Sequence, residues 1–308
     1  MKGNDHILIA DFGATNVRIC LTNKRKVICE QRNYLLSDYS SAEDLITNYF
    51  EDIKKKVTKG VIGVAAPVIR DEIIFTNTNI KFNRRSLKEK LFFESLEVLN
   101  DLELQAYALD SLIDEDLLRL GKAKEQKKGT KVLISPGSGL GLAGLIEKKV
   151  VFTEGGHLKV PSYSDEIGGL VTKFKEEKGR APDFEDLLSG KGINFILRSL
   201  KNCPSTEYSN EEILNNSKDK DCLKTREILI NLLSTYAQYI ALIWGATSGV
   251  FFSGSIANTL LKPNEAELFR RAFESSSKMK DLLQIMPTFL IKDIDLGLKG
   301  GLVLASRY

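Results

Sequence analysis

The stretch ILIADFGATNVRICL, residues 7–21, contains two apolar runs rich in β-branched side chains, separated by a short polar turn. Such runs predict two strands, and Asp11, Gly13 and Asn16 are residue types that tight turns favour. A glycine turn can also point backbone amides together at an anion, with the aspartate orienting Mg²⁺ through its waters and Thr15 donating to a phosphate. The residues alone leave both interpretations open, a plain hairpin and a phosphate-binding one.

The stretch KVLISPGSGLGLAGLI, residues 131–146, repeats this layout of an extended run, a turn of small residues and an apolar return. The repeat predicts a duplicated domain plan. Its glycines match GxGxxG, but a dinucleotide-binding turn needs a helix after the glycines, whereas EKKVVF at residues 147–152 predicts another hairpin. We therefore expect any phosphate site to be of a two-hairpin kind, with Gly13 and Gly137–Gly139 on opposite sides of one nucleotide.

The rest of the chain alternates helix and strand patterns. Helical periodicity, with Ser41 in a capping position, predicts a helix that ends near Val57. Apolar periodicity predicts two further helices, over residues 102–120 and 223–244. Short strands are expected at residues 61–66, 72–77, 97–100, 249–252 and 286–291. This order predicts a mixed α/β protein.

The composition indicates a globular protein and excludes several partners. The chain has 308 residues, 43% of them hydrophobic, and 44 basic against 41 acidic residues give a net charge of only +3. Such a balance argues against nucleic acid or an anionic membrane as a partner and favours small molecules or further copies of the chain. The four cysteines form no CxxC pair, so we expect free thiols in a reducing cytosol. No leader and no apolar run of about 18 residues is apparent, so we expect a soluble cytoplasmic protein.

Three further groups of polar residues are candidates for a site. Asn100 and Asp101 end a predicted strand, where α/β proteins collect ligands, and Asp101 could accept a proton from a hydroxyl; alternatively, both cap the next helix. Glu154 and His157 flank two glycines, so both side chains can bend toward one point. Polar ligand recognition suits this pair better than zinc, because no further histidine is near, and a polar surface turn is the alternative. The third candidate is Glu185, for which the alternative is an exposed charge on a helix.

Eight motifs resemble those of bacterial-type glucokinases, the hexokinase-like branch of the actin and sugar-kinase superfamily, in family order and at close to family spacing. They are DFGATN, GVAAPV, FTNTNIKF, VLNDLELQAYAL, GSGLG, TEGGH, EDLLSG and GVFFSGSI. The resemblance covers nearly the whole chain. It implies an α/β, two-domain actin-like sugar-kinase fold of the duplicated ribonuclease H-like kind, with an interdomain cleft. The implied domains are residues 1–105 plus 292–308, a small α/β domain, and residues 106–291, a large α/β domain.

The resemblance also implies roles for individual residues, with Asp101 as the catalytic base. The residues implied to bind the sugar or to lie close to it are Thr76, Asn77, Asn100, Asp101, Glu154, His157 and Glu185. The residues implied to hold the phosphates or to lie near the adenosine are Asp11, Gly13, Ala14, Thr15, Asn16, Gly137, Ser138, Gly139, Gly254 and Ser255. No residue is implied to build a metal site from protein ligands alone.

The implied activity is ATP-dependent phosphorylation of glucose to glucose 6-phosphate, a step of glycolysis, with ATP and Mg²⁺ as cofactors. The resemblance further implies a cytoplasmic homodimer whose cleft closes at hinges near residues 102–106 and 290–297. Ala14 and Ser255 stand where the family usually has glycine, and this difference concerns nucleotide affinity and donor choice. The alternatives are a kinase for another hexose or an amino sugar, a sugar-binding regulator without catalysis, and an actin-like filament or chaperone ATPase.

Overall fold

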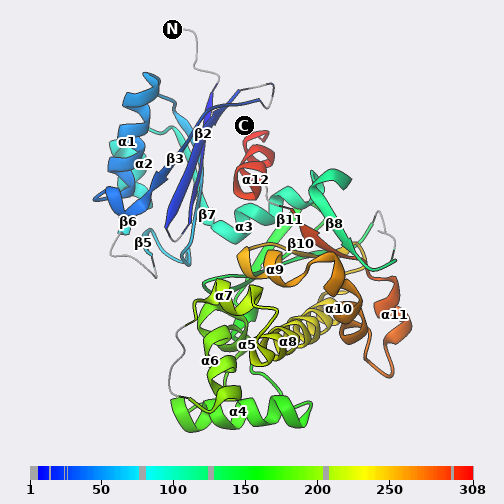
Figure 1. Cartoon of the computed structure of the whole chain (residues 1–308). Coiled ribbons are helices and arrows are strands. Elements are labelled where there is room, and N and C mark those ends of the chain that lie inside the picture. The colour runs from blue at the N-terminus through cyan, green and yellow to red at the C-terminus, as the bar shows by residue number, and fades with distance from the viewer. Residues whose placement is uncertain are drawn as a thin grey trace. The chain divides into compact units, whose positions relative to one another are not determined.

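The computed structural model describes residues 6–13, 15–23, 25, 27–75, 81–123, 128–203, 208–292 and 295–307. Its contacts divide the chain into two compact units (Figure 1). The first unit comprises Met1–Leu112, Lys148–Phe152 and Asp295–Tyr308, and the second comprises Ile113–Glu147 and Thr153–Ile294. The domain boundaries expected after residue 105 and before residue 292 stay predictions.

The first unit is built on a five-stranded sheet with the order β3-β2-β1-β4-β7. Its strands are β1 (Ile7–Phe12), β2 (Asn16–Thr22), β3 (Ile28–Leu35), β4 (Lys59–Val64) and β7 (Ser95–Asn100). The first three strands form an antiparallel meander, which confirms the opening hairpin, and β4 and β7 run parallel to β1. A separate small hairpin joins β5 (Glu72–Ile74) to β6 (Lys81–Asn83).

Helices cover both faces of this sheet (Figure 1). They are α1 (Ala42–Ile53), α2 (Arg84–Lys90), α3 (Asp101–Ala106) and α12 (Leu296–Ala305). The Ser41 side chain caps α1 by accepting the Asp44 amide, and the apolar stripe of α1 is buried. That cap and that stripe are the features that predicted this helix, because a capped amphipathic segment forms where it can bury one face.

A second, six-stranded sheet has the order β11-β10-β9-β12-β13-β8. Its strands are β8 (Leu117–Leu120), β9 (Lys131–Pro136), β10 (Leu140–Ile146), β11 (Lys149–Thr153), β12 (Gly249–Phe252) and β13 (Thr288–Ile291). The helices of the second unit are α4 (Asp165–Lys178), α5 (Phe184–Leu188), α6 (Gly190–Lys201), α7 (Asn210–Asn215), α8 (Lys220–Trp244), α9 (Ser255–Leu260), α10 (Ala266–Phe273) and α11 (Lys280–Ile285). The long helix expected over 223–244 is α8.

The duplicated plan is confirmed by the two sheets. The antiparallel pair β9 and β10 with β11 repeats β1, β2 and β3, and β12 and β13 follow in parallel as β4 and β7 do. A tight turn at Glu147 and Lys148, both with positive φ, leads from β10 into β11, so a strand rather than a helix follows the glycines. The hairpin expected after the glycines is therefore confirmed, and β8 is an additional edge strand. A phosphate site of the two-hairpin kind stays a prediction.

The helix expected over residues 102–120 is wrong beyond its first turns. The α-helix ends at Ala106, a 3₁₀ turn covers Tyr107–Asp110, and residues 117–120 form β8. A second 3₁₀ turn at Asp114–Asp116 separates them, in which the Asp116 carboxylate accepts the amide of Ile113. The segment becomes a strand because it pairs antiparallel with β13, a partner that local periodicity does not reveal.

Two further expectations concern the whole chain. All four cysteines are free thiols, two of them buried. None of the helices in the described ranges combines the length and the apolar composition that a membrane crossing requires.

Candidate active site

The turn after β1 is closed by a backbone hydrogen bond. The Gly13 amide donates to the Asn16 carbonyl at 3.0 Å, and a Cβ at Gly13 would lie only 3.1 Å from that oxygen. Thr15 and Asn16 are exposed, so their side chains are free to meet a ligand, whereas Ala14 lies outside the described residues. The turn therefore satisfies the hairpin interpretation and leaves donors on its surface.

Asp11 precedes this turn and is buried, with 6% of its surface exposed. The start of α12 packs on it so closely that a Cβ at Gly297 would overlap its carboxylate. Arg18 lies 4.0 Å from Asp11 and pairs with Asp295 at 2.9 Å. Burial raises the pKa of Asp11 to about 6, against the opposing charge of Arg18.

Asn100 and Asp101 lie at the carboxyl end of β7, in the same sheet as β1. The Asn100 side chain accepts the amides of Leu102 and Glu103 at 2.9 and 3.3 Å and donates to the Ala66 carbonyl. The capping interpretation is therefore correct for Asn100. Asp101 is the first residue of α3, is partly buried, and accepts the Leu102 amide at 2.9 Å.

The carboxyl group of Asp101 has an unusual acidity. Burial and the negative charge of Asp11 raise its pKa to about 7, although hydrogen bonds from the Leu102 amide and neighbouring groups act in the opposite direction. Two carboxyl groups at the carboxyl ends of parallel strands in one sheet thus share an electrostatic environment. A carboxyl group with a pKa near neutrality can take up and release a proton under physiological conditions.

In the second unit, the glycine loop between β9 and β10 is tied to α5 and α6. The Gly137 amide donates to the Gly139 carbonyl at 2.8 Å, and the Gly190 amide donates to the Gly137 carbonyl at 3.1 Å. Glu185 accepts the Leu140 amide at 2.8 Å. One carboxylate oxygen of Glu185, a candidate sugar-binding residue, is therefore held by the loop itself.

The loop has open space at one end. A Cβ at Gly137 would meet nothing within 4 Å, and Ser138 is exposed. At Gly139, in contrast, a Cβ would lie 2.6 Å from the Glu185 carboxylate. Only glycine therefore allows Glu185 to reach the Leu140 amide.

Gly254 lies beside this loop, at the end of β12. Its φ of 91° and the position of the Pro136 carbonyl, which would lie 2.8 Å from a Cβ at this residue, both require glycine. Ser255 begins α9 and is exposed. The buried hydroxyl of Ser253 has no hydrogen-bond partner in the described part of the chain. The candidate adenosine residues and the candidate phosphate loop thus lie together at the carboxyl ends of β9 and β12.

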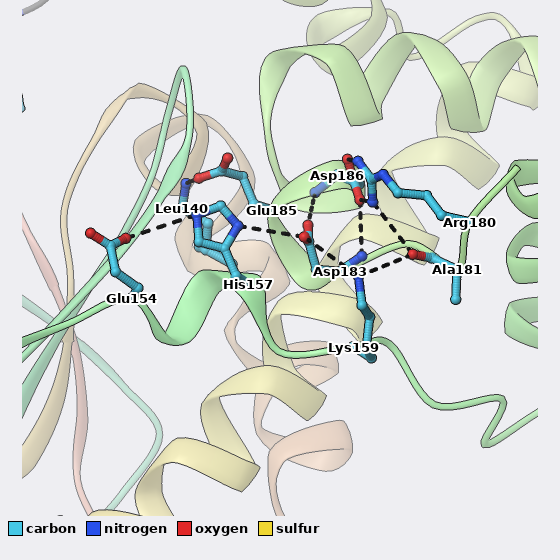
Figure 2. A network of polar contacts seen from close by, with 9 residues as sticks. All are labelled: Leu140, Glu154, His157, Lys159, Arg180, Ala181, Asp183, Glu185 and Asp186. Atoms are coloured by element: carbon cyan, nitrogen blue, oxygen red, sulfur yellow. Dashed lines mark hydrogen bonds and ion pairs between the residues drawn. The ribbon is translucent and has the colours of Figure 1, made fainter. Parts of the chain in front are cut away.

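Glu154 and His157 face one another across a 3₁₀ turn formed by Gly155–His157 (Figure 2). The Nε2 atom of His157 lies 3.8 Å from a carboxylate oxygen of Glu154, and about half of each side chain is exposed. The turn packs on β10, because a Cβ at Gly156 would overlap the Leu140 carbonyl. The expectation that both side chains bend toward one point is confirmed, and Leu140 links this pair to Glu185.

Asp183 is a residue that sequence reasoning missed. Its carboxylate lies 3.4 Å from Nδ1 of His157, on the side of the ring opposite Glu154 (Figure 2). Asp183 also caps α5 in a capping box with Asp186. The spacing of Asp183 and Asp186 in PDFEDLLSG was the available signal for the cap, and nothing local connects this cap to the histidine.

The sequence-predicted residues therefore fall into two groups, one in each unit. The first unit carries Asp11, Gly13, Thr15, Asn16, Asn100 and Asp101, and the second carries Gly137, Ser138, Gly139, Glu154, His157, Glu185, Gly254 and Ser255. Thr76 and Asn77, like Ala14, lie outside the described residues. Each group combines glycine turns with carboxylate or imidazole side chains.

Comparison with known proteins gives a consistent family. A family model described as Glucokinase matches residues 8–308. A glucokinase of Caulobacter sp. is 29% identical over 96% of this chain and 94% of its own length. A protein of Burkholderia orbicola named "Bifunctional protein glk" is 31% identical over 92% of this chain, which spans 46% of that longer protein.

A solved structure shows the same fold. The crystal structure of a glucokinase from an Antarctic psychrotroph matches with a TM-score of 0.85 at 23% identity, over 99% of both chains. The fold class expected from the sequence, a two-domain actin-like α/β fold, is thereby confirmed.

Proposed function

Because this chain belongs to the glucokinase family, we propose that it transfers the γ-phosphoryl group of ATP to the 6-hydroxyl of glucose, with Asp101 as the general base. The observation that carries the chemical part of the proposal is the acidity of Asp101. Its pKa, raised to about 7 by burial and by Asp11, suits a group that accepts a proton from a hydroxyl near neutral pH.

Phosphoryl transfer needs alignment of the acceptor and stabilisation of charge more than covalent work by the protein. Asp101 would align the sugar hydroxyl and take its proton. Asn100, whose amide group is already held by the Ala66 carbonyl and by two helix amides, would contribute a rigid contact to the sugar. A rigid neighbour favours catalysis because the acceptor is then positioned before the reaction.

The second unit would recognise the sugar and the nucleotide. Glu154 and His157 offer two polar groups that face the same point, and Glu185 is oriented by its hydrogen bond to the Leu140 amide. The loop of Gly137–Gly139 would donate backbone hydrogen bonds to phosphate oxygens from amides other than that of Gly137, since small residues allow close approach. Gly254 and Ser255, adjacent to this loop, would lie near the adenosine.

The carboxyl groups of the first unit suit Mg²⁺. The described residues contain no cluster of three or more His, Cys, Asp or Glu side chains arranged to hold a metal ion. Mg²⁺ in kinases usually keeps several waters and binds one or two carboxylates together with substrate phosphates, so a buried Asp11 beside the first turn fits this pattern. When bound, the ion would offset negative charge on the phosphates.

Several finer features stay predictions. They are the sugar contacts of Thr76 and Asn77, the phosphate contact of Ala14, the interdomain cleft with its hinges near residues 102–106 and 290–297, the homodimer, the cytoplasmic location and the place in glycolysis. Closure over the sugar is expected because water could otherwise replace the sugar as phosphoryl acceptor.

A coupled assay of ADP release over a panel of sugars tests the proposal. We expect turnover with glucose and Mg·ATP, and almost none without sugar. A higher kcat/KM for mannose, fructose or glucosamine than for glucose would contradict the assigned substrate. Sugar binding without ADP release would indicate a regulator, and ADP release that needs no sugar would indicate an ATPase of the filament or chaperone type.

A further inference from the structure

We propose that Asp183 is a positioning residue that holds His157 in the tautomer with its proton on Nδ1, which leaves Nε2 as a hydrogen-bond acceptor beside Glu154. Its consequence for sugar binding rests on the proposed function, and its structural part does not. The ligand class that this arrangement selects is a pair of neighbouring hydroxyl groups, one donating to His157 and one to Glu154.

The first observation is the contrast in burial between Asp183 and His157. The side chain of Asp183 is 12% exposed, whereas that of His157 is 54% exposed. One carboxylate oxygen of Asp183 accepts the Asp186 amide at 3.0 Å, and the other lies 3.4 Å from Nδ1 of His157. The buried carboxylate is thus anchored on one side and presents its second oxygen to an accessible ring.

The second observation is a clamp that fixes Asp183. The Asp186 carboxylate accepts the Asp183 amide at 2.9 Å and is itself held by both terminal nitrogens of Arg180, at 2.6 and 2.8 Å. Figure 2 shows this chain of contacts from Arg180 through Asp186 and Asp183 to the imidazole. A bidentate arginine pair has a defined geometry, so it restricts the rotation of Asp186 and of the cap.

The third observation is a backbone link between the segments that carry the two residues. Lys159 and Asp183 form a β-bridge, the Phe184 amide donates to the Leu158 carbonyl at 2.9 Å, and the Val160 amide donates to the Pro182 carbonyl at 3.1 Å. The distance between Asp183 and the neighbouring His157 is therefore set by main-chain bonds. A contact of 3.4 Å can shorten when a ligand orders the ring.

The chemistry of the two groups then determines the tautomer. An ionised carboxylate only accepts hydrogen bonds, and a neutral imidazole has one donor nitrogen and one acceptor nitrogen. With Nδ1–H directed at Asp183, Nε2 keeps its lone pair. Nε2 and the Glu154 carboxylate are then two acceptors 3.8 Å apart, too far for a direct bond, and hydroxyl groups that donate to each satisfy both.

Lys159 is a weaker partner for this carboxylate oxygen of Asp183 than His157 is. The Lys159 ammonium is 4.0 Å from the same carboxylate oxygen, with 60% of its side chain exposed, so water screens that pair. The competing description is that Asp183 only caps α5. Serine and asparagine cap helices about as well as aspartate, so substitution can separate the two roles.

Nitrogen-15 NMR of the two histidines tests the inference in the unliganded full chain. The chain contains only His6 and His157, and His6→Gln assigns their signals. At a pH about two units above the ordinary histidine pKa of ~6.5, we expect the wild type to show the Nδ1–H tautomer at His157. In Asp183→Asn the cap uses the amide oxygen, so the NH₂ group faces Nδ1 and the ring should switch to Nε2–H.

The binding measurement follows the tautomer. Asp183→Asn should weaken glucose binding about ten-fold, since the lone pair at Nε2 is lost, while kcat at saturating glucose changes less than about three-fold. Asp183→Ser retains the cap, so its melting temperature should stay near wild type while it loses the tautomer preference. Asp219→Asn, the same substitution at the N-cap of α8, is the matched control and should change neither the tautomer nor the affinity.

The outcomes are separable. A wild type that already shows Nε2–H, or an Asp183→Asn protein that keeps Nδ1–H, overturns the positioning role whatever the enzyme does. A tautomer switch without loss of glucose affinity overturns the assigned hydroxyl contact. A wild type that phosphorylates no sugar contradicts the proposed function, and the tautomer comparison still decides the part played by Asp183.

Discussion

The two sheets share a strand order, but the two units differ in how some of their acidic side chains are held. In the first unit, Asp11 and Asp101 lie at the ends of parallel strands, and burial raises the pKa of both. In the second unit, burial also raises the pKa of Asp186, but hydrogen bonds from Arg180 and from Asp183 outweigh it and lower that pKa. Asp11 and Asp101 of the first unit and Asp186 of the second therefore lie in opposite electrostatic environments.

This difference suggests a division of labour. A buried carboxyl group with a raised pKa carries an unfavourable negative charge when it is ionised. A proton taken from a substrate, or a cation that arrives with the substrate, relieves that charge. Carboxylates already paired by arginine and helix amides are suited to hold other groups in place. On the proposed function, the first unit would then carry the catalytic base and the second most of the sugar-binding residues.

The largest expected effect belongs to Asp101. Asp101→Asn keeps the shape of the side chain but cannot take a proton, so kcat should fall by about 10² to 10⁴. Its melting temperature should not fall, because Asn100 supplies the helix cap and an asparagine at 101 can still accept the Leu102 amide. Steady-state kinetics check this result, and a variant that keeps more than about a tenth of wild-type kcat argues against a base at this position.

Asp11 predicts how stability depends on pH. Its folded-state pKa of about 6 exceeds the unfolded value, so the folded chain binds the proton more tightly than the unfolded chain does. The resulting contribution to the free energy of unfolding is lost as pH rises from about 4 through 6. The free energy of unfolding of Asp11→Asn, relative to wild type, should therefore rise by up to about 3 kcal/mol over this window. Urea unfolding at several pH values measures it.

The control for that series has the opposite sign. Asp186 has a lowered pKa, so the stability it contributes is present above its unfolded pKa and is lost as pH falls through its folded pKa. Asp186→Asn should therefore differ from wild type most at neutral pH and least in acid. If the free energies of unfolding of the two variants, relative to wild type, changed with pH in the same direction, the electrostatic contrast between Asp11 and Asp186 would be contradicted.

The packing of α12 on Asp11 gives a smaller effect. A methyl group at Gly297 would overlap the Asp11 carboxylate, so Gly297→Ala should lower the free energy of unfolding by about 2 kcal/mol and reduce kcat. Gly169→Ala, in α4, meets nothing within 4 Å and should stabilise by up to about 1 kcal/mol through helix propensity alone. Denaturant titrations of both variants distinguish steric overlap from helix propensity. Equal changes in the free energy of unfolding would show that the overlap at Asp11 is unimportant.

Local pattern predicted much of the fold, whereas the roles of the candidate site residues came from the family resemblance and stay predictions. The hairpins, α1 and α8 follow from alternation, caps and periodicity, which operate within one segment. Residues 117–120 were predicted wrongly because their strand exists only through pairing with β13. A helical interpretation of that apolar segment was locally reasonable.

The same distinction applies to the site. Glu154 and His157 are three residues apart, so their approach could be predicted from the turn between them. Asp183 could not be connected to His157, since the bridge at Lys159 brings the two segments together and leaves no mark in either one alone. The hydrogen bond from Leu140 to Glu185 was missed for the same reason.

The division of labour is tested most directly by calorimetric titration of glucose into wild type, His157→Ala and Asp101→Asn. We expect His157→Ala to weaken glucose binding at least several-fold, because a sugar hydroxyl loses its hydrogen-bond partner, whereas Asp101→Asn should change the Kd by less than about three-fold although its turnover is lost. Unchanged affinity in His157→Ala, or a larger loss of affinity in Asp101→Asn than in His157→Ala, would contradict this division.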